Sequence, residues 1–142
     1  MSHTTRVTGI EITDVAALKM AVGDLKLAGV NCELLENTKP RAYSNRQEGM
    51  GEAEFVLKLN DATYDVGLYK SDNNYEARTD FYQGSVQRVL GAPDAKTNQE
   101  KLGKLYMYYS ANAVSRSLAM KGISSRRVTQ ENGSLRILAS VA

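Results

Sequence analysis

Hydrophobic and polar residues alternate along much of the chain, as they do in half-buried strands. Alternating runs cover residues 4–13, 30–36 and 55–59, and others follow near the middle and at the C-terminus. A period of two places successive side chains on opposite faces of a sheet. Gly9 disturbs the phase of the first run, so we expect a β-bulge near this residue.

Two segments instead show the three-to-four spacing of an amphipathic helix. The first begins after Asp14, a residue type that caps helices, and ends at Gly29. The second covers residues 101–122, and its wide apolar stripe predicts a deeply packed helix. Thr97 and Glu100 precede the second helix with the spacing of a capping box.

Turn residues connect these elements. Asn60-Asp61 and Asn73-Asn74 predict tight turns between three consecutive antiparallel strands, with Asn73-Asn74 in the left-handed conformation. A short helix fits residues 81–91. Glu131-Asn132-Gly133 predicts that residues 123–141 form a C-terminal hairpin, because Asn-Gly is a strong hairpin signal.

The order of these elements predicts a single α+β domain over residues 1–142. Its sheet is rich in antiparallel pairs, two to three helices pack on one face, and the chain ends in a β-hairpin. A chain of 142 residues with 42% apolar residues is long enough for one domain with its own core. Residues 37–53 lose all periodicity and predict a long loop, a feature that is uncommon unless the loop is functional or mobile.

The formal charge of +2 changes the range of partners that we expect. Eighteen basic side chains against sixteen acidic ones are too few for bulk nucleic-acid binding through phosphates. The single cysteine, Cys32, cannot form an intramolecular disulfide, and we interpret it as a small apolar residue at the start of a strand. No apolar run has the length of a signal peptide or a membrane span, so we expect a cytoplasmic protein without a membrane partner.

The segment YDVGLYKSDNNYEARTDFYQG, residues 64–84, holds four of the eight tyrosines. Alternation predicts that Tyr64 and Tyr75 pack within the sheet. It places Tyr69 on the opposite face, and we expect Tyr69 and Tyr82 to be available for binding.

Several motifs together are similar to one known family. The opening MSH, the run TDVAALKMAVGDL, the central YDVGLYKSDNNYEARTDFY and the closing QENGSLRIL resemble the hypothetical chloroplast reading frame 35 family, a domain of unknown function. The chain departs from that pattern in residues 36–54, in lacking tryptophan and in its Tyr106 to Tyr109 run, which suits a diverged viral or bacterial member. The resemblance implies a fold and a compartment, the bacterial or host cytosol or the plastid stroma, and no activity.

No spacing matches a catalytic or metal-binding constellation. His3 is the only histidine, and a nucleophilic triad would have to use it. Asp61, Asp65, Glu76 and Asp80 could line one face of adjacent strands, although such carboxylates commonly keep a sheet soluble. We therefore predict no metal and no cofactor, and we favour a binding protein over an enzyme.

Arginines and tyrosines are the candidate binding residues, because the forked donors of arginine suit phosphate and tyrosine rings stack on bases. Arg116 could join them from the last helix. Alternation sends Arg126 and Arg127 to opposite faces, so only one of the two can enter a given pocket. The candidate ligand-binding residues are Arg41, Tyr43, Arg46, Tyr69, Tyr82, Arg126, Arg127 and Arg136.

Two functional hypotheses remain open at this point. The first is a small non-enzymatic cytosolic binding or adaptor protein that acts through protein partners or assembles with itself as a homo-oligomer. The alternative is a protein that captures a nucleotide-like or phosphate ligand with the arginines and tyrosines above, for example to sequester a signalling molecule if the gene is viral.

Overall fold

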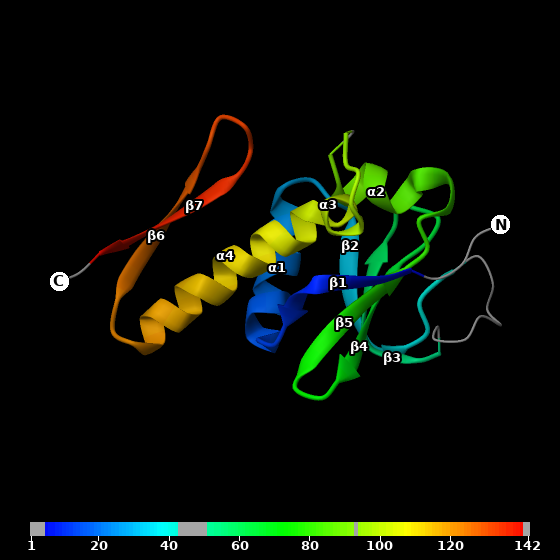
Figure 1. Ribbon diagram of the computed structural model, residues 1–142, viewed down its shortest axis with the longest axis horizontal. Helices are drawn as coiled ribbons and strands as arrows, with labels where there is room; N and C mark the ends of the chain where they lie inside the picture. The colour runs from blue at the N-terminus through cyan, green and yellow to red at the C-terminus, as the bar shows by residue number, and fades with distance from the viewer. Residues whose placement is uncertain (1–4, 43–50, 93, 141–142) are drawn as a thin grey trace.

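The chain builds a five-stranded antiparallel sheet and a separate two-stranded hairpin (Figure 1). The computed structural model describes residues 5–42, 51–92 and 94–140. In sequence order the elements are β1 (Thr5–Ile12), α1 (Val15–Leu27), β2 (Cys32–Thr38), β3 (Ala53–Leu59), β4 (Val66–Ser71), β5 (Asn74–Thr79), the 3-10 turn η1 (Tyr82–Gly84), α2 (Ser85–Leu90), α3 (Asn98–Lys101), α4 (Gly103–Met120), β6 (Ser124–Thr129) and β7 (Leu135–Ser140). The predicted α+β class and C-terminal hairpin are confirmed.

The hydrophobic core lies between the large sheet and the helices α1 and α4. Leu18 and Leu25 of α1, Leu57 of β3, Leu68 of β4 and Leu105 of α4 are all fully buried. Because apolar side chains are spaced at three or four positions along α1, one face of that helix packs on the core while the other stays in water.

The predicted cap of the first helix is also confirmed. Asp14 is the N-cap of α1, and its carboxylate accepts a hydrogen bond of 3.1 Å from the amide of Ala17. Gly29 follows the end of the helix with φ of 96°, a left-handed value that glycine adopts without steric cost.

The sheet has the strand order β1-β5-β4-β3-β2, so β1 and β2 are its edges. The pairing of β1 with β5 is irregular between Val7 and Ile12, where we expected a bulge. The meander β3-β4-β5 is confirmed, but its first connection, residues 60–65, is longer than the tight turn predicted at Asn60-Asp61. Its second turn differs from the prediction, because Ser71 pairs with Asn74 and Asp72, with φ of 54°, is the left-handed residue in place of Asn73 and Asn74.

The long segment between the second and third strands is shorter than predicted. β2 continues to Thr38 and β3 already begins at Ala53, which leaves residues 39–52 between them. Residues 43–50 of this segment lie outside the described part of the chain.

The last helix is deeply packed only in its first half. The predicted capping box is present, because the Thr97 hydroxyl accepts a hydrogen bond of 3.1 Å from the amide of Glu100. It caps the short helix α3, however, and α4 begins separately at Gly103 without a side-chain cap. Tyr106 and Tyr109 are buried, whereas Val114 is 47% exposed and Met120 is 85% exposed. The wide apolar stripe, which predicted a deeply packed helix, therefore extends beyond the sheet, and the hairpin packs beside this part of α4 (Figure 1).

Candidate partner-binding surface

The C-terminal hairpin, residues 124–140, is called the arm below. Its register pairs Arg126 with Leu138, Arg127 with Ile137 and Val128 with Arg136. Residues that pair directly in an antiparallel ladder point to the same face, so Arg127 and Ile137 share one face. The opposite face carries Arg126, Val128, Arg136 and Leu138 and is called the outer face.

The inner face of the arm is attached to the body by a polar cluster. Arg127 forms an ion pair with Asp24 of α1, with an Nη1 to Oδ2 distance of 3.0 Å, and its guanidinium lies 6.0 Å from the centre of the Tyr108 ring. The buried Asn112 side chain donates hydrogen bonds to the same Asp24 carboxylate and to the Tyr108 carbonyl. One carboxylate therefore connects α1, α4 and the arm.

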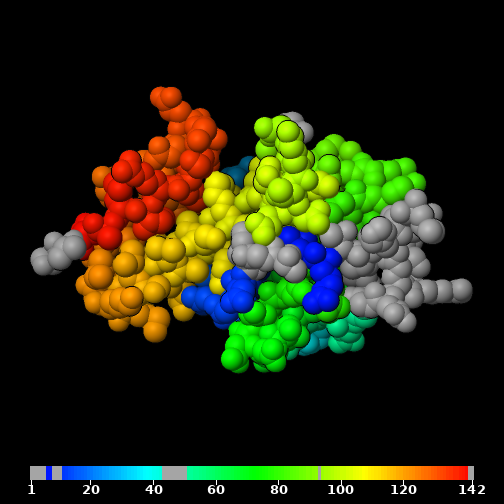
Figure 2. All heavy atoms as spheres, viewed as in Figure 1, coloured from blue at the N-terminus to red at the C-terminus, as the bar shows by residue number. Residues whose placement is uncertain are grey.

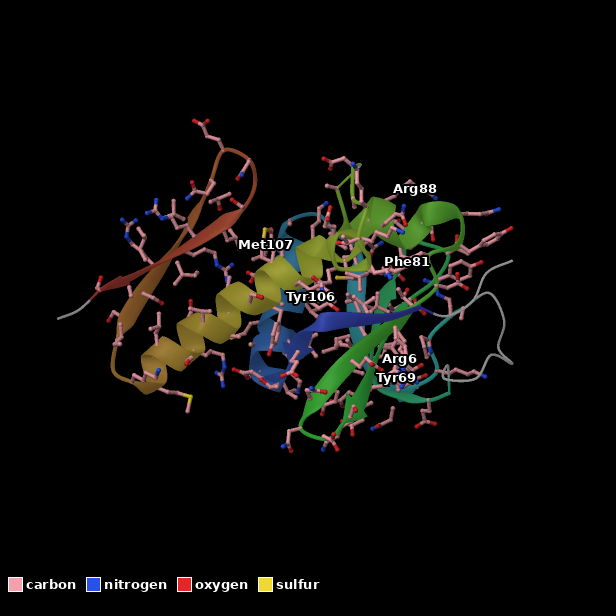
Figure 3. All side chains as sticks on the ribbon, in the orientation of Figure 1. Arg6, Tyr69, Phe81, Arg88, Tyr106 and Met107 are labelled. Atoms are coloured by element: carbon pink, nitrogen blue, oxygen red, sulfur yellow. The ribbon has the colours of Figure 1, made fainter. Side chains whose placement is uncertain are left out.

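A hollow remains where the arm lies over α4. A volume of about 260 Å³ is lined by Met107, Ser110, Ala111, Val114, Leu135 and Ile137. A neighbouring volume of about 400 Å³ extends it toward α2 and is lined by Leu90, Gly91, Ala92, Glu100, Gly103, Lys104, Met107, Asn132, Gly133 and Ser134. Figure 2 shows the surface notched between the arm and the neighbouring helices, and Figure 3 shows Met107 on the side of α4 near the arm. We call the two volumes together the arm groove.

The outer face mixes guanidinium groups with apolar side chains. Arg126 lies opposite Leu138, and Val128 lies opposite Arg136. Each strand therefore contributes one arginine and one apolar residue to this face, and each arginine lies opposite an apolar residue of the other strand. Val128 and Leu138 are half-buried, and both arginines are exposed. In the part of the chain that the structure describes, neither Arg126 nor Arg136 forms an ion pair.

The charge of the chain is divided unevenly between its two parts. Residues 1–95 hold ten Lys and Arg against fourteen Asp and Glu, whereas residues 96–142 hold eight against two. A net charge of +2 therefore combines about −4 on the sheet side with about +6 on α3, α4 and the arm. Such an asymmetry favours association of the C-terminal part with an anionic partner.

Arg41, a predicted ligand-binding residue, is held by the body of the protein. Its Nη2 lies 2.7 Å from Oδ1 of the buried Asp65 and also donates to the Leu59 carbonyl. The backbone amides of Arg41 and Leu59 donate to the same carboxylate. Bonding to Asp65 raises the pKa of Arg41. This pair fastens the segment after β2 to the start of β4, which is a structural task.

The other predicted arginines do not meet in one place. Arg116 pairs with Asp14 at the start of α1, with an Nε to Oδ2 distance of 2.8 Å. Arg127 pairs with Asp24 on the inner face of the arm, whereas Arg126 and Arg136 lie on its outer face. The predicted separation of Arg126 from Arg127 is thus present.

Three residues considered from the sequence cannot be placed. His3, Tyr43 and Arg46 lie outside the described residues. The two remaining arginine candidates, Arg126 and Arg136, share the outer face of the arm.

The tyrosines of the central segment divide broadly as predicted. Tyr64 is buried, and Tyr75 is half-buried with its ring edge-on to Phe55. Tyr69 lies on the opposite face of the sheet, and Tyr82 is 37% exposed.

Tyr69 is more enclosed than a free stacking platform. Its hydroxyl donates to the Gly51 carbonyl at 3.0 Å, and Arg78 lies 4.5 Å from the ring centre. A Cβ on Gly67 would approach the ring to 2.6 Å, so only glycine allows Tyr69 to lie flat on the sheet. Burial raises the pKa of Tyr69. The ring covers the outer sheet surface beside the cluster of Arg6, Glu76 and Arg78 (Figure 3).

Three of the four carboxylates considered for a metal site have other partners. Asp65 binds Arg41, Glu76 binds Arg6 and Arg78, and Asp80 accepts from the Tyr82 amide. Among the described residues no group of three or more His, Cys, Asp or Glu side chains is arranged to hold a metal ion.

Two further findings concern the thiol and the helices. Cys32 is buried, and its burial raises the pKa of the thiol. None of the described helices has both the length and the apolar character to cross a membrane.

Sequence reasoning missed Met107, Val128 and Leu138, although two signals pointed to them. The uneven charge along the chain marks the C-terminal part, and the alternation of the hairpin continues on both faces. This hairpin carries apolar residues on both faces, with Ile137 on one and Leu138 on the other. A single helix can cover only one of these faces, so the other is left without a covering layer in the described part of the chain.

Comparison with known proteins adds no further constraint. No family model, curated protein or solved structure matches the chain. The similarity to the chloroplast reading frame 35 family therefore stays a prediction.

Proposed function

We propose that the protein is a small non-catalytic binding protein whose arm and arm groove contact a protein partner. One observation carries this proposal. The arm is a two-stranded sheet with an unpaired edge on each strand, and none of its described residues is buried. Isolated two-stranded hairpins are marginally stable, and unpaired edges and half-buried apolar faces are features that partners cover.

The chemistry of the outer face specifies the class of partner. Arginine beside apolar residues is typical of protein interfaces, where guanidinium groups bind carboxylates and the apolar groups are desolvated. The charge of about +6 on residues 96–142 favours an acidic partner. We therefore propose a protein segment that presents acidic and apolar side chains together.

A second copy of the chain fits the outer face less well than an acidic partner. A two-fold interface would place the outer faces of two arms against each other and bring four arginines, Arg126 and Arg136 of each copy, into one interface. Like charges at such an interface are costly when they are desolvated. Self-assembly through another surface remains our prediction from the sequence.

The alternative function, capture of a nucleotide-like anion, is supported by the two arginines of the outer face. Arg41, Arg116 and Arg127 are bound to carboxylates. Among the described residues no arginine lines the arm groove. Small anionic ligands require a concave site with converging donors. The described arginines support such a site less well than they support a protein interface.

The test is affinity capture from cells that naturally produce the protein, followed by reconstitution with the purified partner. The variant Arg126→Glu with Arg136→Glu should weaken the reconstituted complex at least tenfold, since each loses a favourable contact and gains a repulsive one. The matched control is Lys70→Glu with Arg88→Glu, which makes the same charge change at exposed residues of the body and should change affinity less than twofold.

Two outcomes would contradict the proposal. One is a purified partner that has the same affinity for the arm variant, Arg126→Glu with Arg136→Glu, as for the control variant, Lys70→Glu with Arg88→Glu. The other is a phosphorylated metabolite that copurifies with the protein in native mass spectrometry and is lost with the arm variant, which would favour the capture function.

A further inference from the structure

A second groove lies between α1 and β2, and it is formed by residues that the arm does not use. It has a volume of about 530 Å³ and is lined by Lys19, Val22, Gly23 and Lys26 of α1 and by Leu34, Leu35 and Glu36 of β2. Because β2 is an edge of the five-stranded sheet, no strand in the described part of the chain pairs with its outer side.

The backbone of β2 offers hydrogen-bonding groups toward this groove. The Asn60 amide donates to the Asn31 carbonyl at 3.0 Å, and the register places Cys32 opposite Leu59. In an antiparallel ladder alternate residues bond to the same neighbour, so Glu33 and Leu35 bond to β3. The backbone groups of Cys32, Leu34 and Glu36 consequently point away from the sheet.

Gly23 occupies the interior of α1 without a reason that comes from the fold. Its φ is not in the left-handed region, and a Cβ at this position would meet no described atom within 4 Å. Glycine in a helix interior is destabilising relative to alanine because it loses more backbone entropy on folding. Neither backbone conformation nor close packing requires it, and its effect is to keep the groove open on the helix side.

Two lysines flank this glycine along the groove. Lys19 and Lys26 are exposed and lie one helical turn before and after Gly23. Within the described residues neither lysine forms an ion pair, and Glu36 is the only acidic residue that lines the groove. The groove therefore favours an occupant with negative side chains.

A second copy of the chain is a poor occupant for the same reason. Pairing of two β2 edges about a two-fold axis perpendicular to the sheet would place two α1 helices side by side on one face. Lys19 and Lys26 of one copy would then face the same lysines of the other, and like charges in such an arrangement repel.

We propose that the groove binds an extended acidic segment of a partner protein by β-strand addition to β2. The backbone of the segment pairs with Cys32, Leu34 and Glu36, and its acidic side chains contact Lys19 and Lys26. This site extends beyond the function proposed for the arm, since it concerns a different surface and a different mode of recognition.

The probe for this site is a blocked peptide of about eight residues that alternates glutamate and valine, a typical strand length. Titrated into isotope-labelled protein, it should shift the amide resonances of Cys32, Leu34 and Glu36 and slow their hydrogen exchange. The peptide that alternates lysine and valine is the matched control for charge, and it should bind at least tenfold more weakly.

Variants at one position separate groove blockage from loss of folding. Gly23→Gln fills the groove and should weaken the acidic peptide at least tenfold, whereas Gly23→Ala should leave binding nearly unchanged. Both substitutions should raise the thermal midpoint, because both introduce better helix formers. The arm variant Arg126→Glu with Arg136→Glu should bind the peptide normally, which distinguishes this site from the arm.

Three results would overturn the proposal. These are equal affinity for the acidic and basic peptides, unchanged binding by Gly23→Gln, and resonance shifts that fall outside α1 and β2. A dimer in which the β2 amides are protected without peptide would likewise overturn it in favour of a second copy.

Discussion

The meander β3-β4-β5 and the arm β6-β7 are both antiparallel, and they differ in what covers them. In the body, Leu57 of β3 and Leu68 of β4 are completely buried under α1 and α4. In the arm, Ile137 and Leu138 are both only half-buried, on opposite faces. Alternation of apolar residues thus defines a strand in both regions, and only the presence of a second layer turns that strand into core.

The comparison also separates two uses of arginine. Arg41 binds a buried carboxylate, Asp65, and stabilises the body. Arg126 and Arg136 have no ion pair within the described structure and lie beside half-buried apolar groups. An arginine is informative about binding when the protein itself has not satisfied its donors.

The largest expected effect is on the free energy of unfolding, when one leucine of the body and one leucine of the arm are each replaced by alanine. Leu57→Ala removes a completely buried side chain and should lower the free energy of unfolding by about 3 kcal/mol. Leu138→Ala should lower it by about 1 kcal/mol or less, because this side chain is half-buried. Urea denaturation measures both, and equal losses would show that the arm belongs to the cooperative core.

The ion pair between Arg41 and the buried Asp65 should give the next largest effect. Asp65→Asn keeps the size of the side chain and removes the charge that binds Arg41, so we expect a loss of about 2 kcal/mol in the free energy of unfolding. Asp61→Asn, an exposed substitution in the same turn, is the control and should change stability by less than about 0.5 kcal/mol. Similar values for the two variants would contradict the structural role of Arg41.

Breaking the attachment of the arm should affect mainly the arm. Arg127→Met removes the ion pair with Asp24 and should cost about 1 kcal/mol, because the pair is partly exposed. Amide hydrogen exchange should become faster in β6 and β7 while the body is unchanged. Arg126→Met, on the other face of the same strand, should leave exchange unaltered, and faster exchange in both variants would argue against the Asp24 attachment.

The smallest effect is a pH dependence on the outer surface of the sheet. The hydrogen bond from Arg6 lowers the pKa of Glu76, and Arg78 acts in the same direction against the effect of burial. The stabilisation from Glu76 is complete above the usual glutamate pKa of 4.5 and is lost as the pH falls through the depressed value.

Glu76→Gln provides the measurement of that contribution. The urea midpoint of the variant should fall less steeply below pH 4.5 than that of the natural protein, because the titrating carboxylate is absent. Identical slopes would show that the Arg6 and Arg78 contacts do not stabilise the folded state.

Local signals in the sequence predicted most elements of the fold. Asp14, the Thr97 capping box and the Asn132-Gly133 turn each depend on hydrogen bonds within a few residues, so the sequence specifies them directly. The left-handed residue of the β4-β5 turn was misplaced because Asp72, Asn73 and Asn74 all tolerate that conformation, and strand register decides among them.

Contacts between distant parts of the chain could not be predicted from local patterns. Arg41 meets Asp65 and Arg127 meets Asp24 only in the folded structure, and these pairs remove two arginines from the candidate ligand-binding set. The burial of α4 was overestimated for a similar reason, since its apolar stripe continues past the sheet to Val114. An apolar stripe indicates that one face of a helix is covered, but it does not indicate whether the core, the arm or a partner covers that face.

Site-specific photo-crosslinking in cells that naturally produce the protein would show whether the outer face of the arm contacts a protein partner. A photoreactive residue would replace Leu138 on the outer face of the arm, or Tyr82 at an exposed position of the body. The account predicts one specific crosslinked protein with the Leu138 probe and none with the Tyr82 probe. A crosslink at Tyr82 with none at Leu138 would contradict it and would place the partner on the body.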